Sequence, residues 1–281
     1  MYRILEKQIL NDVVRKIIID TPLIAKKAEP GQFVIIRSNS DSERIPLTIS
    51  DYDRNNGTIT LIYQVVGAAT MELDRLNKYD NIHDVVGPLG MATDLSNTNK
   101  AVVVGGGVGS AIAYPIVKKI KKMGKEVDSI IGFRNKDLVI LEDEFKKSSD
   151  KFVIMTDDGS YGEKGLVTTA LEKLINDGNN YDEIFAIGPI AMMKFVTEVA
   201  KKYRIKITVS MNPIMIDGTG MCGGCRLTVG GKTKFACVDG PDFDGTLVDF
   251  DEVMRRNNTY REFEKHAFEE ECNLLKLADN K

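Results

Sequence analysis

Apolar and polar positions divide the chain into regions of different periodicity. The first, residues 1 to about 97, holds short β-rich runs separated by turns such as Pro30-Gly31. Short strands at this regular spacing are typical of a small antiparallel β-barrel. The expected strands cover residues 13–20, 32–37, 58–66 and 81–86, and a helical turn or two is expected over residues 70–76.

From about residue 98 the pattern becomes an alternation of strands and helices. A fully apolar run at 101–104 leads into a glycine-rich turn at 105–109, and a helical pattern then continues to residue 123. Strands that alternate with helices indicate a parallel sheet that is covered on both faces. Further strands are expected at 127–133, 152–155, 183–187 and 205–209, with helices at 165–175 and 191–202.

The C-terminal part of the chain combines a cysteine-containing hairpin with a helical tail. Two short strands, 226–229 and 232–236, flank the turn Gly230-Gly231, and apolar positions recur at roughly helical spacing from 249 to about 277. The predicted fold class is therefore β plus α/β. We expect an antiparallel barrel at 1–97, a Rossmann-like parallel domain at 98–210, a cysteine module at 211–248 and a helical tail at 249–281.

Composition and charge argue against several classes of protein. A chain of 281 residues, 43% hydrophobic and 28% charged, suits an ordinary globular protein with two domains and a small module. The net charge of −3, without a basic stripe, makes nucleic acid an unexpected partner. We expect neither a secretory signal nor a membrane span. The clustered cysteines favour a reducing, cytoplasmic compartment.

Three of the four cysteines lie in one short stretch together with an aspartate. Cys222 and Cys225 are separated by two residues, so both thiolates can reach one metal, and Cys237 follows the hairpin. A thiolate-rich site selects zinc or an iron–sulfur cluster over a hard cation. No histidine is near in sequence, which leaves Asp217 as the candidate for a fourth ligand. A structural zinc hairpin and buried free thiols, with Asp217 as a turn residue, are the alternatives.

Two motifs in the barrel region suit a phosphate-bearing cofactor. The planar guanidinium of Arg44 can donate two parallel hydrogen bonds to a pyrophosphate, and the hydroxyl of Thr48 can reach the edge of a flavin ring. Gly67 and Thr70 open a helical stretch, whose free N–H groups attract phosphate. The alternatives are a surface arginine on an edge strand and a simple helix cap.

The glycine-rich turn and two later strand ends suit a dinucleotide. Glycines directly after a buried strand allow close approach of a pyrophosphate, although the full G-x-G-x-x-G pattern is absent. Asp157 and Gly188 also follow strands, and a carboxylate there would accept ribose hydroxyls and favour NAD over NADP. Ordinary turn chemistry is the alternative, and Arg134 and Lys136 leave the opposite preference open.

Taken in order, these motifs resemble the ferredoxin-reductase superfamily, and within it flavoprotein subunits with an appended 2Fe–2S domain. The chain is similar over its whole length to the small-subunit family of NADH-dependent reduced ferredoxin:NADP oxidoreductases, also described as sulfide dehydrogenase subunits. The resemblance implies that FAD is bound by Arg44, Pro46, Leu47, Thr48, Tyr63, Val65, Gly67 and Thr70, that NAD(H) is bound by Gly106, Gly107, Gly109, Asp157 and Gly188, and that a 2Fe–2S cluster is bound by Asp217, Cys222, Cys225 and Cys237.

The same resemblance implies an NAD(H)-dependent flavin iron–sulfur oxidoreductase subunit. Its partner would be a larger flavin and 4Fe–4S subunit that binds NADP(H) and ferredoxin, in an electron-bifurcating heterodimer. The electron-transfer subunit of NAD-dependent dihydroorotate dehydrogenase, which carries four cysteines in this module, is the first alternative. A zinc-binding, nucleotide-sensing interaction protein is the alternative from another class, and a reductase that needs no large subunit is a third.

Overall fold

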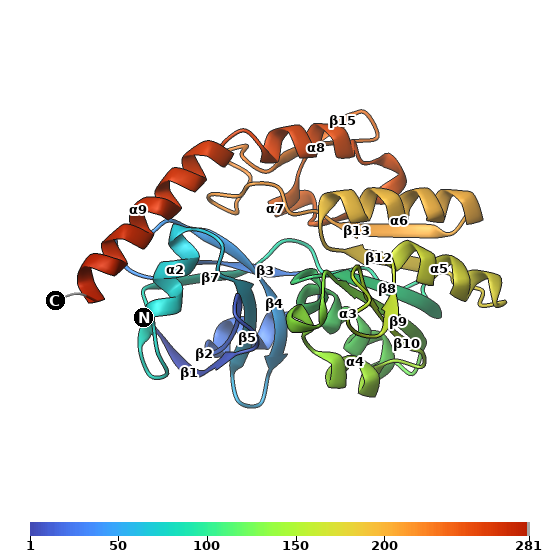
Figure 1. Cartoon of the computed structure of the whole chain (residues 1–281), viewed down its shortest axis with the longest axis horizontal. Coiled ribbons are helices and arrows are strands. Elements are labelled where there is room, and N and C mark those ends of the chain that lie inside the picture. The colour runs from blue at the N-terminus through green and yellow to red at the C-terminus, as the bar shows by residue number, and fades with distance from the viewer. Residues whose placement is uncertain (280–281) are drawn as a thin grey trace.

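Two seven-stranded sheets lie side by side, and the C-terminal segment runs across both of them (Figure 1). This computed structural model describes the backbone of residues 1–279 and the side chains of residues 1–270. No helix in that part of the chain is both long and apolar enough to cross a bilayer.

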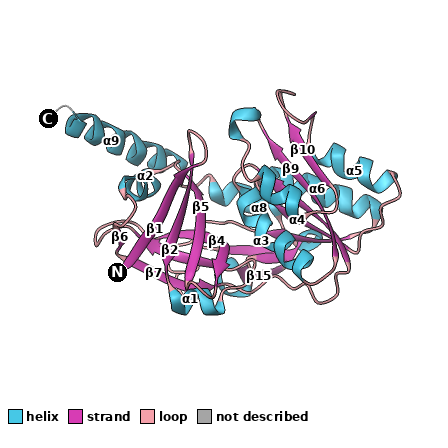
Figure 2. Cartoon of the chain, turned by 90° about the horizontal axis from the view of Figure 1, so that it is seen from below, coloured by secondary structure: helices cyan, strands magenta, loops and turns pink. Residues whose placement is uncertain are grey.

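The first sheet is antiparallel and curls into a half-barrel, as the strand spacing predicts (Figure 2). Its order is β6-β1-β2-β5-β4-β3-β7, and its interior is filled by side chains such as Ile17, Ile49 and Leu61. The first strand was not expected, because charged residues break its apolar pattern. The elements are β1 (Tyr2–Ile9), β2 (Val14–Asp20), α1 (Pro22–Lys27), β3 (Phe33–Arg37), β4 (Ile45–Asp53), β5 (Thr58–Gln64), α2 (Ala68–Arg75), β6 (Asn81–Ile82) and β7 (Asp84–Leu89).

The second sheet is parallel except at one edge, with order β11-β10-β9-β8-β12-β13-β16. In β8, Val102 and Val104 face helices α5 and α6, whereas Val103 faces α3 and α4, which explains the fully apolar run. The elements are β8 (Lys100–Gly106), α3 (Gly109–Lys122), β9 (Glu126–Phe133), η1 (Lys136–Leu138), α4 (Glu142–Ser148), β10 (Phe152–Thr156), β11 (Glu163–Lys164), α5 (Val167–Asn176), β12 (Glu183–Ile187), α6 (Ile190–Tyr203) and β13 (Lys206–Ser210).

The C-terminal segment is built into the second sheet instead of standing apart from it. Its strand β16 (Asp242–Asp244) pairs antiparallel with β13 and forms the sheet edge. Helix α8 (Phe250–Asn257) packs against α6 and β14, and its side chains Phe250 and Val253 are buried. The remaining elements are β14 (Arg226–Val229), β15 (Lys232–Phe235), α7 (Ala236–Asp239), η2 (Gly245–Leu247) and α9 (Arg261–Asp279).

The expected helical tail is two helices with different surroundings. A turn after Asn257 ends α8, and α9 then runs back to the half-barrel, where it lies beside α2 in both views (Figures 1 and 2). The side chains of α9 described here are mostly exposed, including Phe263 at 75%. Cys272, the fourth cysteine of the chain, lies outside the residues whose side chains are described.

The half-barrel and the parallel sheet meet through apolar and charged contacts. Val14 and Ile62 of the barrel are buried in the same cluster as the residues of α3. Glu29 accepts hydrogen bonds from Arg54 (2.6 Å) and from Lys119 of α3 (3.0 Å). Burial of Glu29 opposes its ionisation, but these two cations outweigh burial and lower its pKa. Half-exposed ion pairs contribute about 0.2–1 kcal/mol each, so burial of the two apolar side chains, about 1.5–3 kcal/mol apiece, dominates this contact.

One carboxyl group lies where the three parts of the chain meet. Asp242 begins β16, pairs in register with Ser210 of β13, and accepts a hydrogen bond of 2.6 Å from the hydroxyl of Thr93, in the segment that follows the barrel. Its Oδ1 is buried and has no hydrogen-bond partner among the described residues. Burial raises the pKa of this carboxyl, and the side chains of Thr93 and Ser210 offset that effect only in part.

We expect Asp242→Asn to stabilise the protein at neutral pH. Because the pKa of Asp242 is raised on folding, the native state binds a proton more tightly, and the stability of the natural chain falls as pH rises above about 4, the unfolded-state value. The variant should lack this fall and be more stable than the natural chain at pH 7.5. Urea denaturation at pH 4.5 and pH 7.5 tests it, with the exposed Asp12→Asn as control. An equal effect of Asp242→Asn at both pH values would contradict the expectation.

Candidate functional site

Two cysteine sulfurs meet at the base of the β14–β15 hairpin. Cys225 directly precedes β14, and Cys237 lies in α7, just after β15. Their sulfurs are 3.2 Å apart, and the N–H of Cys237 donates to the sulfur of Cys225 (3.4 Å). In the sequence, Cys225 precedes the first strand of the hairpin and Cys237 follows the second. The pairing of Arg226 with Phe235 brings both cysteines to the base, and the tip is Gly230-Gly231.

The loop before Cys225 holds the other two candidate ligands. Asp217 accepts N–H hydrogen bonds from Thr219 and Cys222, both 2.9 Å long. These backbone donors, that of Thr219 first, hold the pKa of Asp217 below its ordinary value, so the carboxylate is charged. The loop turns back on itself through glycines with positive φ angles: Gly218 at +74°, Gly220 at +83° and Gly223 at +67°.

The three thiols differ in exposure. Cys225 is 1% exposed and Cys237 2% exposed, whereas Cys222 lies at the surface. Burial, together with the neighbouring Cys225, raises the pKa of Cys237 to about 12. The metal-free thiol is therefore protonated at neutral pH, and a metal that binds here must displace its proton.

The donor set suits an iron–sulfur cluster or another thiophilic metal centre. The structure brings Cys225 and Cys237 into direct contact and ties Asp217 to Cys222 in the adjoining loop. Within the described residues, however, no three His, Cys, Asp or Glu side chains converge on one point, so the two pairs remain separate. Backbone N–H groups already point at two sulfurs, since Gly224 donates to Cys222 (3.4 Å) as Cys237 does to Cys225. Such donors are typical of iron–sulfur ligand loops.

The ligand loop packs directly on the half-barrel. A Cβ placed on Gly218 would lie 2.8 Å from a methyl of Leu89 and 3.0 Å from Ile35, so the backbone touches strands β7 and β3. Cys225 and Cys237 also share one buried cluster with Ile35 of the barrel and with Val209 of the parallel sheet. The candidate metal centre therefore contacts both sheets.

The predicted dinucleotide residues meet at the ends of β8 and β12. These strands are parallel neighbours, with Gly105 opposite Ile187. A Cβ on Gly109 would lie 2.7 Å from the carbonyl oxygen of Ile187 and from Cα of Gly188, so the two chain segments touch through backbone. Gly107 has a positive φ of +54° and open space around it. The turn thus leaves room for a phosphate group to approach the backbone.

Sequence reasoning missed one side chain at this junction. Met192 lies in the first turn of α6, and its sulfur would be 2.4 Å from a Cβ on Gly106. Its methyl would be 2.8 Å from a Cβ on Gly188, so this one thioether packs on both glycines. Its neighbour Met193 is fully buried in the core. The helical spacing of apolar residues could not separate these two roles.

The adjoining strand ends carry exposed charges of both signs. Asp157 follows β10 and Arg134 follows β9, and the two strands are parallel neighbours. Both side chains are exposed. Asp158 instead is engaged locally, since it accepts from the N–H (2.9 Å) and the hydroxyl (2.7 Å) of Ser160. Asp157 is therefore the carboxylate that remains available to a ribose.

The barrel motif lies on the half of β4 that has one strand neighbour. Pro46 and Thr48 pair with β3, whereas β5 pairs with β4 only from Ile49 onward. Pro46 has no N–H, but because β5 does not pair with this half of β4, no hydrogen bond between strands is lost. Arg44, just before the strand, is exposed, and Leu47 and Thr48 are half-buried, so this half strand can accept a ligand.

The start of α2 is also open. A Cβ on Gly67 would meet nothing within 4 Å, and its φ of −147° suits any residue, so the fold itself does not demand glycine there. The hydroxyl of Thr70 accepts the N–H groups of Val66 and Gly67, both at 3.0 Å, and fixes the turn. In the preceding strand, Tyr63 is 2% exposed and its hydroxyl has no partner among the described residues, whereas Val65 is half-exposed.

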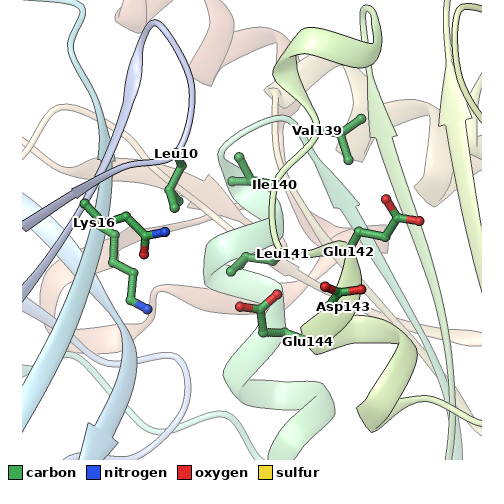
Figure 3. A pocket seen from close by; sticks show the side chains of 9 residues that line it. Leu10, Lys16, Val139, Ile140, Leu141, Glu142, Asp143 and Glu144 are labelled. Atoms are coloured by element: carbon green, nitrogen blue, oxygen red, sulfur yellow. The ribbon is translucent and has the colours of Figure 1, made fainter.

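Two surface cavities lie elsewhere. One, of about 250 Å³, lies between Leu10 and Lys16 of the barrel and the segment Val139 to Glu144, which carries the acidic residues Glu142, Asp143 and Glu144 (Figure 3). The other, of about 430 Å³, lies between the β4–β5 turn and α3. Neither is lined by a predicted site residue.

Comparison with known proteins supports the family that the motifs predict. Residues 212–249 match the family described as the iron-sulfur cluster binding domain of dihydroorotate dehydrogenase B. The chain is 47% identical to the "Dihydroorotate dehydrogenase B (NAD(+)), electron transfer subunit homolog" of Thermotoga maritima, over 92% of this chain and 95% of that protein. It is 35% identical to the electron transfer subunit of that enzyme from Fusobacterium nucleatum, over 79% of this chain and 87% of that one.

A solved structure is similar over nearly the whole chain. It comes from work on flavin-based electron bifurcation by the NADH-dependent reduced ferredoxin-NADP oxidoreductase, with a TM-score of 0.91 and 46% identity over 96% of this chain and 97% of that one. The ferredoxin reductase of carbazole 1,9a-dioxygenase, at 18% identity and a TM-score of 0.62 over 73% of this chain and 65% of that one, shares the fold.

We expect Gly109→Ala to destabilise the protein and Gly67→Ala to leave its stability nearly unchanged. The added methyl at position 109 would collide with the backbone at Ile187 and Gly188, which cannot move without shifting β12. Overpacking of this kind costs about 1–3 kcal/mol. Urea denaturation of both variants measures the difference. Equal stability of the two would contradict the close approach of the two backbone segments.

Proposed function

The chain belongs to the electron-transfer subunits of the ferredoxin-reductase family, and on this basis we propose that it relays electrons between NAD(H) and a larger partner subunit through FAD and a 2Fe–2S cluster. One observation carries the proposal. The candidate ligands Asp217, Cys222, Cys225 and Cys237 lie in the matched iron–sulfur domain, at a site that packs against both the half-barrel and the parallel sheet. The family also sets aside the zinc-binding alternative, because its domain holds iron and sulfur.

The half-barrel supplies the residues that would hold FAD. Arg44 and Thr48 approach from β4, and the open backbone at Gly67, in front of α2, would face the pyrophosphate. Thr70 fixes this backbone through its two accepted N–H groups. Pro46, Leu47 and Val65 would pack against the ring, and the buried Tyr63 would support them from the barrel core.

The parallel sheet supplies the residues that would hold NAD(H). Gly106, Gly107 and Gly109 form a turn that is open to phosphate at Gly107. Gly188, just after β12, meets that turn, and Asp157 is exposed and would accept ribose hydroxyls. The bound cofactors supply the chemistry, which is two-electron exchange with the nicotinamide and one-electron exchange at the cluster. The protein's part is to place the rings and exclude water; no acid or base is required.

We propose that the chain has four functional parts: an FAD half-barrel at 1–97, an NAD domain at 98–210, a cluster module at 211–248 and a partner-binding tail at 249–281. Phe250 and Val253 of α8 are buried, so the part of that tail that is available to bind a partner is α9. Around the exposed Cys222, three apolar side chains also face outward: Ile216 at 55%, Met221 at 89% and Val238 at 45% exposure. We propose that this surface and α9 dock the partner.

The neighbour at 46% identity favours a particular complex. We propose a heterodimer with a larger flavin and 4Fe–4S subunit that binds NADP(H) and ferredoxin and bifurcates electrons, located in the cytoplasm. A set of three cysteines and Asp217, in place of four cysteines, supports this assignment. The names of the bacterial relatives favour the second candidate, an electron-transfer subunit of dihydroorotate dehydrogenase. Co-purification of a barrel-type flavin dehydrogenase would select that candidate.

We expect the anaerobically purified chain to contain flavin, iron and sulfide. Asp217→Ala should lose most of its cluster, because it removes a charged donor, whereas Asp217→Cys should keep a cluster with an altered electron paramagnetic resonance signal. Iron, sulfide and flavin assays with the spectrum of each variant test this. An unchanged signal and iron content in Asp217→Ala would exclude Asp217 as a ligand, and a colourless unaltered chain would end the proposal.

We expect removal of α9, by a chain that ends at Tyr260, to weaken association with the large subunit at least tenfold. The cluster should remain, because the buried contacts of α8 are retained. Co-purification and the iron content of the shortened chain measure the two effects. Undiminished association of an iron-containing shortened chain would show that α9 has no docking role.

A further inference from the structure

Two arginine side chains hold the carbonyl oxygens between Cys222 and Cys225. Nη1 of Arg226 donates to the carbonyl of Gly223 (3.1 Å), and Nη2 of Arg256 donates to the carbonyl of Gly224 (3.2 Å). Arg226 begins β14, whereas Arg256 comes from α8. Both carbonyls of the two-residue spacer are therefore bound by a permanent positive charge.

The first of these contacts is linked to a ligand sulfur through one peptide group. The peptide between Gly223 and Gly224 accepts from Arg226 at its oxygen and donates its N–H to the sulfur of Cys222 (3.4 Å). A cation on the oxygen polarises the peptide and strengthens its N–H as a donor. The charge of Arg226 thus acts on the sulfur without touching it.

The second contact is fixed by the packing of α8. One turn before Arg256, the carboxylate of Glu252 accepts the N–H of Thr228 in β14 (2.8 Å), and Val253 between them is 1% exposed. Arg256 is itself half-buried, so solvent screens its charge less than that of its exposed neighbour Arg255.

We propose that Arg226 and Arg256 are positioning residues that fix the Cys222–Cys225 spacer and raise the reduction potential of the cluster. The inference rests on the proposed function, since it requires an iron–sulfur cluster at this loop. Each reduction adds one negative charge to a centre already held by anionic ligands. Nearby positive charge and N–H donors to sulfur stabilise the reduced form more than the oxidised form, which raises the potential.

The test is a redox titration of the cluster-containing full chain, followed by electron paramagnetic resonance. Arg226→Gln and Arg256→Gln should each shift the midpoint potential downward, and Arg256→Lys should recover part of the shift. Arg255→Gln removes the same charge one residue away without the hydrogen bond, and should shift the midpoint less. Equal midpoints for Arg256→Gln and Arg255→Gln would overturn the proposal.

A second measurement covers a variant that cannot hold iron. In the iron-free chain, amide hydrogen exchange of the 222–226 segment should be faster in Arg256→Gln than in Arg255→Gln, because the spacer loses its anchor. Exchange that is equal in the two would overturn the positioning role. If the unaltered chain contains no iron, the proposed function fails; if it does contain iron and the variants do not shift, only this inference fails.

Discussion

The contact between two buried cysteines at the base of a hairpin organises the C-terminal half of this protein. Cys225 and Cys237 are both buried, and burial raises the pKa of Cys237, yet the loop beside them presents a charged carboxylate and backbone N–H groups. The surrounding apolar cluster contains residues of both sheets. A centre that binds here is therefore shielded on the inside by Cys225 and Cys237, and Cys222 lies on its surface side. Such a geometry suits an electron relay, because one side can face an internal cofactor and the other a partner.

Most of the fold could be predicted from periodicity. The antiparallel first region and the parallel second region follow from turn spacing and from the alternation of strands with helices, and both are confirmed. The first strand was missed because Arg3, Glu6 and Lys7 interrupt its apolar pattern. Strand β16 could not be predicted either, since its three residues gain their conformation by pairing with β13. The break between α8 and α9 depends on the elements against which each helix packs. The local pattern of apolar residues does not contain that information.

The residue types of the candidate site could be predicted from the sequence, but their arrangement in space could not. The spacing of the cysteines predicts candidate ligands, and the order of motifs predicts the family, which the comparisons confirm. The positions that depend on tertiary contact were not accessible: Met192 against Gly106, Gly218 against Ile35, and Arg256 on the ligand loop. Each joins residues far apart in sequence. A single sequence carries no signal of such pairs, because the identity of an arginine or a methionine does not reveal which distant residue it contacts.

The origin of strand β16 has a further consequence for how this chain can be divided. Strand β16 completes the edge of the parallel sheet, and α8 packs on α6. The matched iron–sulfur domain therefore has no hydrophobic core that is entirely its own. Cut out as a fragment, it would leave an unpaired strand edge on one piece and exposed apolar side chains on the other. Transplanting this electron-transfer unit onto another flavoprotein would therefore require carrying its sheet along with it.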